Sequence, residues 1–384
     1  MSQAAVSYPI PKMRYCARCV TPSTRPNIEL DARGVCNACA SHNLKQGIDW
    51  SAREKAFRAV VANAQSRSRG YDCLVPVSGG KDSTWQVVRC LEYGLKPLAV
   101  TWKTPARTEL GARNLENLVR LGVDHIDYQV SPIVERKFLL EGLARSGSTA
   151  IPMHLALFNI PLKIAVRFDI PLVVWGENSA FEYGGAADER MGFRLDERWL
   201  KKYGVTGGTT ARDWISGDLT EKDLTPYFGP SERELDDKKV LAVFLGYYFP
   251  WDPQESLRVA SAHGFQARAE GPKTGYYNYA DIDDDFISIH HYLKWYKFGF
   301  TRLFDNLSLE IRNGRISRDE AIAIVRAAGD QTPRADIEKF CAFTGITAAH
   351  FFSLIEKFRN PEIWTRRGGV WRIEDFLIPD WEWS

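Results

Sequence analysis

The feature of the sequence that most constrains its fold is a regular alternation of short apolar runs and amphipathic stretches between residues 71 and 178. The apolar runs indicate strands at 71–77, 96–102, 125–130 and 170–178. Helical patterns lie between them, at 83–94, 108–122, 133–147 and 154–169. Because strands that alternate with helices favour crossover connections, this pattern predicts an α/β fold built on a doubly wound parallel sheet.

Capping signals place several helix ends. Ser51 with Glu54 three residues later indicates a capping box that opens a helix. This helix and the connector after it together cover residues 51–70. Thr108 is expected to cap the second helix of the alternation, and Gly94 and Gly122 to end helices. Further along the chain, residues 281–330 read as a pair of helices, with "SRDEA" at 317–321 opening the second.

A glycine-rich turn, "SGGKDST" at residues 78–84, follows the first predicted strand. Glycines let the backbone approach a ligand closely, and the N-terminus of the next helix favours phosphate. Ser78, Ser83 and Thr84 add hydroxyl groups and Lys81 adds a positive charge, whereas Asp82 suits a magnesium ion that bridges phosphates. The spacing matches neither a Walker loop nor a dinucleotide fingerprint, so the turn predicts a phosphate site of another type.

Four of the seven cysteines form two C-x-x-C pairs separated by sixteen residues. Cys16, Cys19, Cys36 and Cys39 have the spacing of a four-thiolate zinc site, which is closed to water and therefore structural. Two disulfides in an oxidised domain are the alternative. The sequence thus predicts a zinc-binding module at 1–50, a helix and connector at 51–70, a nucleotide-binding α/β domain at 71–270 and a mainly helical region at 271–384.

Charge and hydropathy exclude several classes of function. The formal net charge of +2 gives no electrostatic reason to expect nucleic acid or an anionic membrane as a partner. No apolar run reaches the length of about 18 residues that a membrane span needs. The first twelve residues lack the features of a secretory signal, so we expect a cytoplasmic protein.

The turn "SGGKDST" after an apolar strand resembles the PP-loop of the ATP pyrophosphatases, which include GMP synthetase, NAD synthetase and the tRNA-thiolating enzymes. That resemblance implies a fold of the adenine nucleotide α-hydrolase type and cleavage of ATP between its α and β phosphates. The loop would grip the pyrophosphate while AMP passes to a carbonyl oxygen, and a nucleophile would then displace the AMP.

Four motifs in order resemble one family within this group, the N-acetyl sugar amidotransferases of O-antigen and of pseudaminic and legionaminic acid biosynthesis. They are "YCARCVTPSTRPNIELDARGVCNAC", "SGGKDST", "WGENSAFEYGG" and "HHYLKWYKFGFTR" with "EIRNGRISRDEA" behind it. The resemblance implies that ATP and ammonia convert an acetamido group to an acetamidino group on a sugar, which we expect to be linked to a nucleotide. It also implies a separate glutaminase subunit as the source of ammonia, sometimes with a cyclase-like companion.

Roles are assigned to residues on these grounds. The expected catalytic residues are Lys81, Asp82, Glu177, His290 and Lys294, and Asp82 is the expected magnesium ligand. ATP is expected to contact Ser78, Gly79, Gly80, Lys81, Asp82, Ser83, Thr84, Thr101, Trp102, Lys103 and Gly176. The substrate is expected to contact Asn178, Glu182, Tyr183 and His291. The alternative for Lys103 is a surface lysine at a strand end, and for residues 175–185 a polar turn with helix-capping groups. The alternative for His290 and His291 is that they only pack within a helix.

A tRNA-thiolating enzyme is the main rival reading. Its chemistry needs a persulfide cysteine or an iron–sulfur site near the loop. Outside the two cysteine pairs only Cys73, Cys90 and Cys341 remain, and none of them forms a C-x-x-C motif. A non-catalytic nucleotide- or zinc-dependent scaffold and an enzyme with its own glutaminase are also disfavoured.

Overall fold

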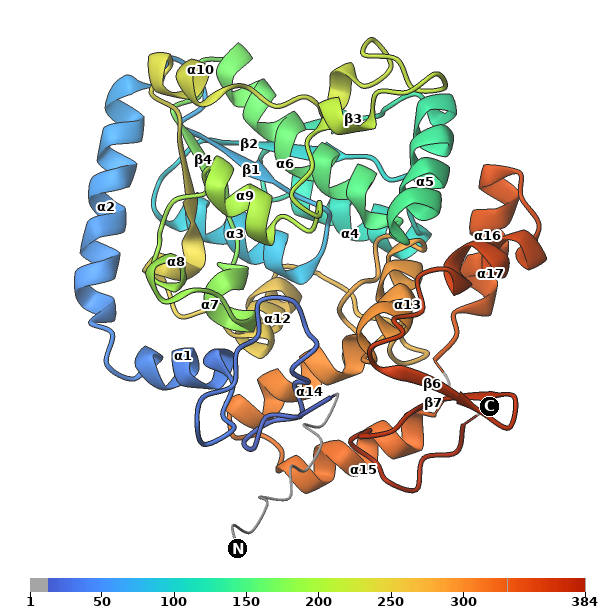
Figure 1. The fold of residues 1–384 in the computed structure, drawn as a ribbon. Helices are drawn as coiled ribbons and strands as arrows, with labels where there is room; N and C mark the ends of the chain where they lie inside the picture. Colours follow the sequence, from blue (N-terminus) through green and yellow to red (C-terminus); the bar gives the residue numbers. More distant parts are fainter. Residues whose placement is uncertain (1–12, 330, 384) are drawn as a thin grey trace, which may run out of the picture.

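The computed structural model describes residues 13–329 and 331–383, so the expectation drawn from residues 1–12 lies outside it. Five parallel strands form the central sheet in the order β3-β2-β1-β4-β5 (Figure 1). Their bounds are β1 Cys73–Pro76, β2 Pro97–Trp102, β3 Asp124–Tyr128, β4 Leu172–Trp175 and β5 Leu241–Phe244. The predicted doubly wound parallel sheet is confirmed, and β5 extends it by an edge strand that the sequence pattern did not indicate.

Successive residues of the strands pack on opposite faces of the sheet, as the pleat requires. Leu74, Leu98 and Val173 join one core cluster, which they share with α5 (Pro132–Ser146) and α6 (Ala150–Arg167). Cys73, Val75 and Val174 join the other cluster, formed with α2 (Trp50–Arg67), α3 (Lys81–Glu92), α4 (Glu109–Val119) and α12 (Pro253–Ala262). Helices therefore cover both faces, which explains why the strands read as continuous apolar runs.

The order of the strands creates a switch point beside β1. From β1 the chain builds β2 and then β3 on one side, and it returns through α5 and α6 to place β4 on the other side. The connections that follow β1 and β4 therefore leave the sheet in opposite directions. A crevice at the carboxyl ends of these strands is where open α/β sheets bind ligands.

The start of α2 differs from the sequence prediction. Its N-cap is Asp49, whose carboxylate accepts a hydrogen bond from Ala52 N at 2.9 Å. The predicted capping box of Ser51 and Glu54 is wrong, because Ser51 already lies inside the helix and Glu54 pairs with Arg58 at 2.6 Å. Asp49 and Ser51 are both capping residue types, and the helix begins after the first of them.

The region 281–330 contains three helices rather than the predicted pair, α13 (Ile287–Phe298), α14 (Arg302–Arg312) and α15 (Arg318–Ala328). Gly299, with a φ of +70°, ends α13, a left-handed conformation that glycine adopts without strain. The predicted start of α15 is confirmed, since Ser317 and Glu320 form a capping box. Beyond it lie α16 (Arg334–Thr344), α17 (Ala348–Glu356) and a hairpin of β6 (Trp364–Arg367) and β7 (Val370–Ile373).

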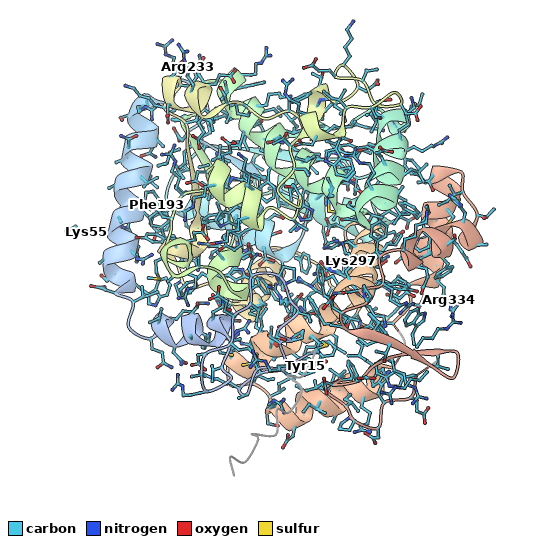
Figure 2. All side chains as sticks on the ribbon, viewed as in Figure 1. Tyr15, Lys55, Phe193, Arg233, Lys297 and Arg334 are labelled. Carbon is cyan, nitrogen blue, oxygen red and sulfur yellow. The ribbon has the colours of Figure 1, made fainter. Side chains whose placement is uncertain are left out.

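Short elements complete the fold. The connection from β4 to β5 contains α7 (Ser179–Tyr183), α8 (Ala187–Arg190), α9 (Glu197–Tyr203), η1 (Ala211–Trp214), η2 (Thr225–Tyr227) and α10 (Glu232–Asp237). The N-terminal module ends in α1 (Asn37–Lys45), and α11 (Leu245–Tyr248) follows β5. The module packs on the C-terminal region, where Tyr15 stacks on Phe304 with ring centroids 6.4 Å apart (Figure 2). No helix in the described part of the chain has the length and apolar character to cross a bilayer.

Candidate active site

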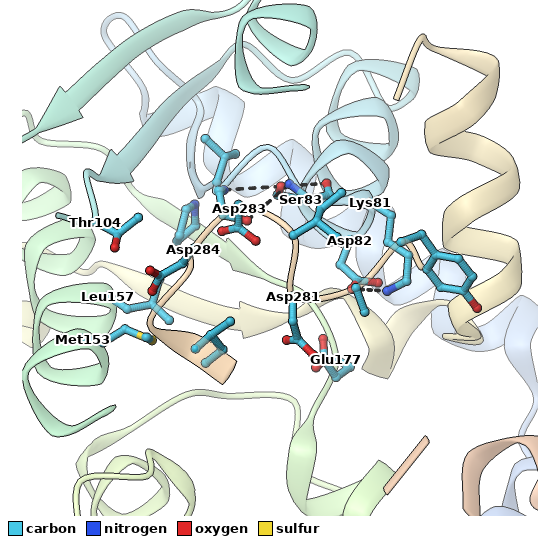
Figure 3. Close-up of a pocket in the computed structure, with 18 of the residues that line it drawn as sticks. Lys81, Asp82, Ser83, Thr104, Met153, Leu157, Glu177, Asp281, Asp283 and Asp284 are labelled. Carbon is cyan, nitrogen blue, oxygen red and sulfur yellow. Dashed lines mark hydrogen bonds and ion pairs between the residues drawn. The ribbon is translucent and has the colours of Figure 1, made fainter. Parts of the chain in front are cut away.

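A cavity of about 390 Å³ lies at the carboxyl edge of the sheet, at the switch point (Figure 3). We call it the site cavity. Its wall is formed by the glycine-rich turn, the ends of β2 and β4, α6, residues 277–284 and α14. Its volume lies in the range of pockets that enclose one organic ligand of moderate size.

The glycine-rich turn joins β1 to α3 and is held in shape by its own hydrogen bonds. The hydroxyl groups of Ser83 and Thr84 donate to Gly80 O at 3.0 and 3.1 Å, and Gly80 N donates to Ser78 Oγ at 3.2 Å. Gly79 has a φ of +86°, and a Cβ there would lie 2.7 Å from Leu115 N of α4. Only glycine fits this position, because the turn is pressed against α4.

Five of the predicted turn residues reach the site cavity, namely Ser78, Gly80, Lys81, Asp82 and Ser83. Gly79 and Thr84 do not contribute to its wall and instead shape the turn. Lys81, only 6% exposed, forms an ion pair with Asp82, and Asp82 Oδ1 accepts a hydrogen bond from Trp251 Nε1 at 3.1 Å. A cation and a carboxylate are thus held side by side at the N-terminus of α3.

The residues after β4 divide into two groups. Glu177 and Tyr183 line the site cavity, whereas Gly176, Asn178 and Glu182 do not. Asn178 caps α7, because its Oδ1 accepts hydrogen bonds from Ala180 N and from Trp199 Nε1, both at 3.0 Å. Glu182 pairs with Lys45 of the N-terminal module at 2.7 Å. The side chains of Asn178 and Glu182 therefore fix the loop that carries Glu177.

The end of β2 contributes Thr101 and Trp102 to the wall, and Lys103 lies outside it. Thr101 Oγ1 is 2.9 Å from His125 Nε2, and Trp102 Nε1 donates to Glu135 Oε1 at 3.0 Å. The polar atoms of both side chains are therefore engaged within the protein, which leaves their remaining surface to contact a ligand.

A segment that sequence reasoning missed brings three carboxylates to the site cavity. Asp283 lies beside Ser83 of the turn, Asp281 near Glu177, and Asp284 near Leu157 (Figure 3). The segment is held against the start of α4, where Thr108 Oγ1 donates to Ile282 O at 2.6 Å and Thr108 N to Asp283 O at 3.1 Å. At Gly111 a Cβ would lie 2.6 Å from the Cα of Asp283, so a side chain there would push the segment away.

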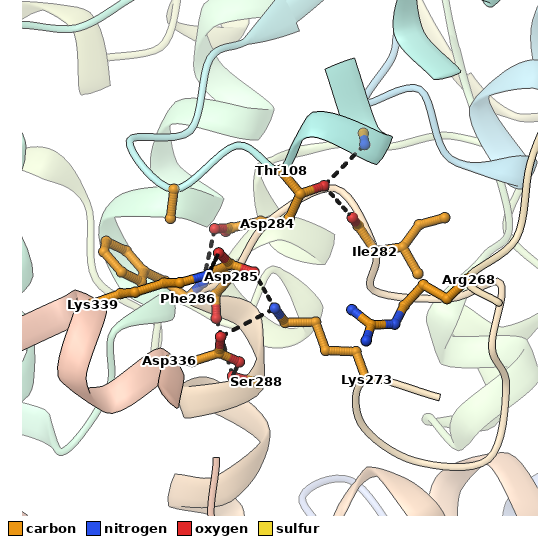
Figure 4. A network of polar contacts seen from close by, with 12 residues as sticks. Thr108, Arg268, Lys273, Ile282, Asp284, Asp285, Phe286, Ser288, Asp336 and Lys339 are labelled. Carbon is orange, nitrogen blue, oxygen red and sulfur yellow. Dashed lines mark hydrogen bonds and ion pairs between the residues drawn. The ribbon is translucent and has the colours of Figure 1, made fainter. Parts of the chain in front are cut away.

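A buried ionic network anchors the other end of this segment (Figure 4). Lys273 pairs with Asp285 and, at 3.1 Å, with Asp336 of α16. Ser288 donates to Asp336 at 2.5 Å. The run "DIDDD" was visible in the sequence, but only these contacts and those with α4 bring it to the turn.

His290 and His291 are buried behind the wall of the site cavity, and Lys294, whose side chain is 17% exposed, does not line the cavity either. His291 lies 3.4 Å from Asp281, which pairs with Arg302 at 3.2 Å. Burial lowers the pKa of His290 well below its usual value and that of His291 to about 4. Both imidazoles are therefore neutral at pH 7.

Lys294 belongs to the same group of ion pairs as Asp281 and Arg302. Its ammonium lies 3.4 Å from Asp305, and Asp305 also pairs with Arg25 of the N-terminal module at 2.7 Å. Burial lowers the pKa of Lys294 to about 8. This group of ion pairs holds Arg302, which lines the site cavity. Arg302 was not among the residues predicted from the sequence.

Three carboxyl groups in the site cavity have raised pKa values. Burial, and then the charge of Asp82, raises the pKa of Glu177 to about 7. Burial raises the pKa of Asp283 to about 6 and that of Asp284 to about 7. These groups exchange protons near neutrality, and a bound cation would favour their ionised forms.

The four predicted zinc ligands converge. The Sγ atoms of Cys16, Cys19, Cys36 and Cys39 lie within 4.8 Å of one another, and all four residues are buried. The Cys16–Cys39 and Cys19–Cys36 distances are 3.9 and 3.8 Å. A disulfide requires about 2.05 Å, whereas four thiolates at about 2.3 Å from a tetrahedral zinc ion lie about 3.8 Å apart. The geometry fits a closed zinc site and not two disulfides.

Among the described residues, the cysteine cluster is the only group of three or more ligand side chains close enough to hold a metal ion by itself. The carboxylates of the site cavity are more widely spread. Magnesium commonly takes one or two carboxylates and completes its shell with water and substrate phosphates. Asp82 and Glu177 fit that pattern, because both line the site cavity.

We expect binding of the magnesium nucleotide to weaken as the pH falls from about 8 to about 6. The raised pKa means that the free protein holds a proton on Glu177 near neutral pH, which a magnesium ion must displace. Each displaced proton weakens binding by up to about tenfold per pH unit below the pKa. Calorimetric titration in buffers of different ionisation enthalpy measures this release, which Glu177→Gln should reduce, and a pH-independent Kd would contradict it.

Comparisons with known proteins give one family match. Residues 273–377 match the model described as "LPS biosynthesis protein WbpG-like, C-terminal domain". This confirms, for that region, the predicted resemblance to proteins of lipopolysaccharide biosynthesis, and the region contains Asp281, Asp283 and Arg302 of the site cavity. The structure of NMN synthetase from Francisella tularensis is similar with a TM-score of 0.34 and 10% identity, over 78% of this chain and 94% of that one. No curated protein matches the chain.

Proposed function

We propose that the protein is an ATP-dependent amidotransferase that converts an acetamido group of an N-acetyl sugar into an acetamidino group, within the biosynthesis of a surface polysaccharide. The products besides the sugar are AMP and pyrophosphate. The observation that carries this proposal is the turn from Ser78 to Ser83 at the switch point, where Lys81 and Asp82 form an ion pair at the N-terminus of α3. The family match of residues 273–377 supports the polysaccharide context.

The proposed reaction has two steps. The acetamido oxygen attacks the α-phosphorus of ATP, and the bond to pyrophosphate breaks, which gives an O-adenylyl imidate. Ammonia then adds to the imidate carbon and AMP leaves with the former acetamido oxygen. Adenylation is needed because an amide carbon is a poor electrophile and its oxygen a poor leaving group.

The turn is proposed to bind the pyrophosphate portion of ATP. The N-terminus of α3 and the hydroxyl of Ser78 supply hydrogen-bond donors, Ser83 shapes the turn through its bond to Gly80 O, and Lys81 offsets charge as pyrophosphate departs. Asp82, with Glu177 nearby, would hold magnesium, which when bound neutralises phosphate oxygens. These groups are held in place before a ligand binds, so little reorganisation accompanies the reaction.

Glu177 is proposed to act in catalysis by holding the magnesium ion beside Asp82. Its pKa of about 7, raised by burial, means that it loses its proton as the ion binds. Arg302 and Arg107 lie in the wall as cationic side chains that orient the substrates. Both are themselves fixed, Arg302 by Asp281 at 3.2 Å and Arg107 by Asp127 at 2.6 Å.

Ammonia is proposed to come from a separate glutaminase subunit, in some systems with a cyclase-like companion, and the reaction to take place in the cytoplasm where ATP is available. The rival sulfur-transfer chemistry finds no support among the described residues. Cys73, Cys90 and Cys341 are buried and none of them lines the site cavity.

The proposal is tested by incubating the protein with ATP, magnesium, an ammonium salt and a panel of free and nucleotide-linked N-acetyl sugars. We expect equal amounts of AMP and pyrophosphate, together with a sugar product in which an NH group has replaced one oxygen. Formation of ADP and phosphate instead would contradict the assignment of the turn. Addition of glutamine without a glutaminase should give no product, because the proposed ammonia source is a separate protein.

A further inference from the structure

A second cavity of about 430 Å³ adjoins the site cavity, and we call it the side cavity. It lies between α6, α9 and residues 206–211 and 227–235. His154 of α6 lines both cavities, so the two meet at its side chain. Nothing in the sequence reading pointed to this residue.

Aromatic side chains form the partition between the two cavities. Phe158 lines the side cavity, and its ring lies 5.0 Å from that of Trp175, which lines the site cavity. The ring of His154 lies 6.2 Å from that of Phe158. Nε1 of Trp175 is buried and has no hydrogen-bond partner among the described residues. The partition thus includes the indole N–H of Trp175, a donor without a partner among the described residues, near His154.

His154 is held in a single tautomer. Its Nδ1 lies 2.8 Å from Ala150 O, and because a carbonyl oxygen only accepts, Nδ1 carries the hydrogen. Burial lowers the pKa of His154 to about 4, so the ring is neutral at pH 7. The lone pair of Nε2 is then available to accept a hydrogen bond at the junction of the cavities.

The sizes of the cavities indicate what each one holds. The proposed reaction brings together two organic substrates, ATP and a sugar, and the site cavity at about 390 Å³ is of the size that encloses one of them. Because the turn lies in the site cavity, the nucleotide is placed there. Ammonia, which needs about the 30 Å³ of a water molecule, would leave the side cavity almost empty.

The lining of the side cavity suits a polyhydroxylated, uncharged group. Hydrogen-bond acceptors for sugar hydroxyls come from the carboxylates of Asp196, Glu197, Glu232 and Glu234 and from the hydroxyl oxygen of Thr206, beside apolar side chains such as Leu200 and Phe228. Among its lining residues, all of which the structure describes, Lys201 is the only lysine or arginine, and Glu197 pairs with it at 2.6 Å. A diphosphate would find no free cation there.

We propose that the side cavity binds the saccharide ring of the acceptor and that the acetamido group passes His154 into the site cavity. Nε2 of His154 accepts a hydrogen bond from the acetamido N–H, which turns the carbonyl oxygen toward the nucleotide. This inference rests on the proposed function, whose substrate it places.

The test fills the side cavity without touching the site cavity. Leu235 of α10 lines the side cavity, and Leu235→Trp should raise the KM for the sugar about tenfold or more, because the added ring occupies the room of the saccharide. The Kd for ATP should not change. Arg233→Trp is the matched control, since Arg233 lies on the same helix with its side chain 90% exposed, and it should leave both constants unaltered.

A second variant keeps the test decisive if Leu235→Trp does not fold. His154→Phe retains an aromatic ring and removes the acceptor, and it should raise the KM for the sugar about tenfold, the value of one hydrogen bond. Saturation-transfer NMR with free and UDP-linked N-acetylglucosamine, N-acetylgalactosamine and N-acetylmannosamine shows which pyranose protons contact the protein. These signals should persist in Arg233→Trp and disappear in Leu235→Trp.

The outcomes separate the two proposals. If the wild-type protein forms AMP with a sugar but both variants keep the wild-type KM for it, the side cavity does not bind the saccharide and the inference is wrong. A raised KM for ammonium with an unchanged KM for the sugar would also overturn it, in favour of a path for ammonia. If the wild-type protein forms AMP with none of the sugars, the proposed function itself fails.

Discussion

Replacement of Asp82 by asparagine is expected to lower the rate of AMP formation by about 10³-fold, an effect of the size that follows the loss of one preorganised electrostatic group. The amide retains the shape of the side chain, and its oxygen can still accept the hydrogen bond from Trp251 Nε1. What disappears is the negative charge that pairs with Lys81 and would hold magnesium. The change removes the negative charge of the side chain and leaves its packing intact.

The control for this prediction lies at the other end of the same helix. Glu92 pairs with Arg89 at 2.7 Å with its side chain 48% exposed, so Glu92→Gln should leave the rate within about twofold of wild type. Single-turnover assays of AMP, at several magnesium concentrations, compare the two variants. Equal rates for Asp82→Asn and wild type would show that Asp82 does not serve the magnesium nucleotide.

The second large effect is expected from Cys36→Ser, which should release zinc and destabilise the protein by several kcal/mol, since structural zinc sites contribute up to about 10–16 kcal/mol. Cys36 supplies one of the four thiolates and also caps α1, where its sulfur accepts a hydrogen bond from Cys39 N. Serine is a poor zinc ligand, so the module should lose the zinc ion that its four cysteines hold together.

This loss should reach the active site through two contacts of the module. Arg25 pairs with Asp305 at 2.7 Å and donates to Tyr183 O at 2.9 Å, and Lys45 pairs with Glu182 at 2.7 Å. Activity should therefore fall together with the thermal midpoint. Cys341→Ser is the control, because Cys341 is buried away from the cluster and its replacement should keep one zinc ion per chain. Wild-type zinc content and stability in Cys36→Ser would contradict a structural zinc site.

The parts of the fold that the sequence predicted are those specified by local pattern. The strand and helix alternation, the turn from Ser78 to Ser83 and the two C-x-x-C pairs depend on neighbouring residues, and the structure places them as expected. Residue spacing is enough in such cases because the physical cause lies within a few residues.

The remaining site residues depend on contacts between distant segments. Asp283 reaches the turn because Gly111 of α4 leaves room for it, and Asn178 is used as a helix cap and a partner of Trp199. Neither fact has a local signature. His290 and His291 lie in the predicted helical region 281–330, but their burial behind Arg302 and Asp281 is a property of the tertiary structure.

Transfer of the acetamido oxygen to AMP is the central claim, and an isotope measurement tests it most directly. A sugar that carries ¹⁸O in its acetamido carbonyl is incubated with the protein, ATP, magnesium and ammonium, and the products are analysed by mass spectrometry. We expect one ¹⁸O atom in each AMP formed and none in pyrophosphate. AMP without the label, or label retained in the amidinated sugar fraction, would contradict adenylation of the amide oxygen.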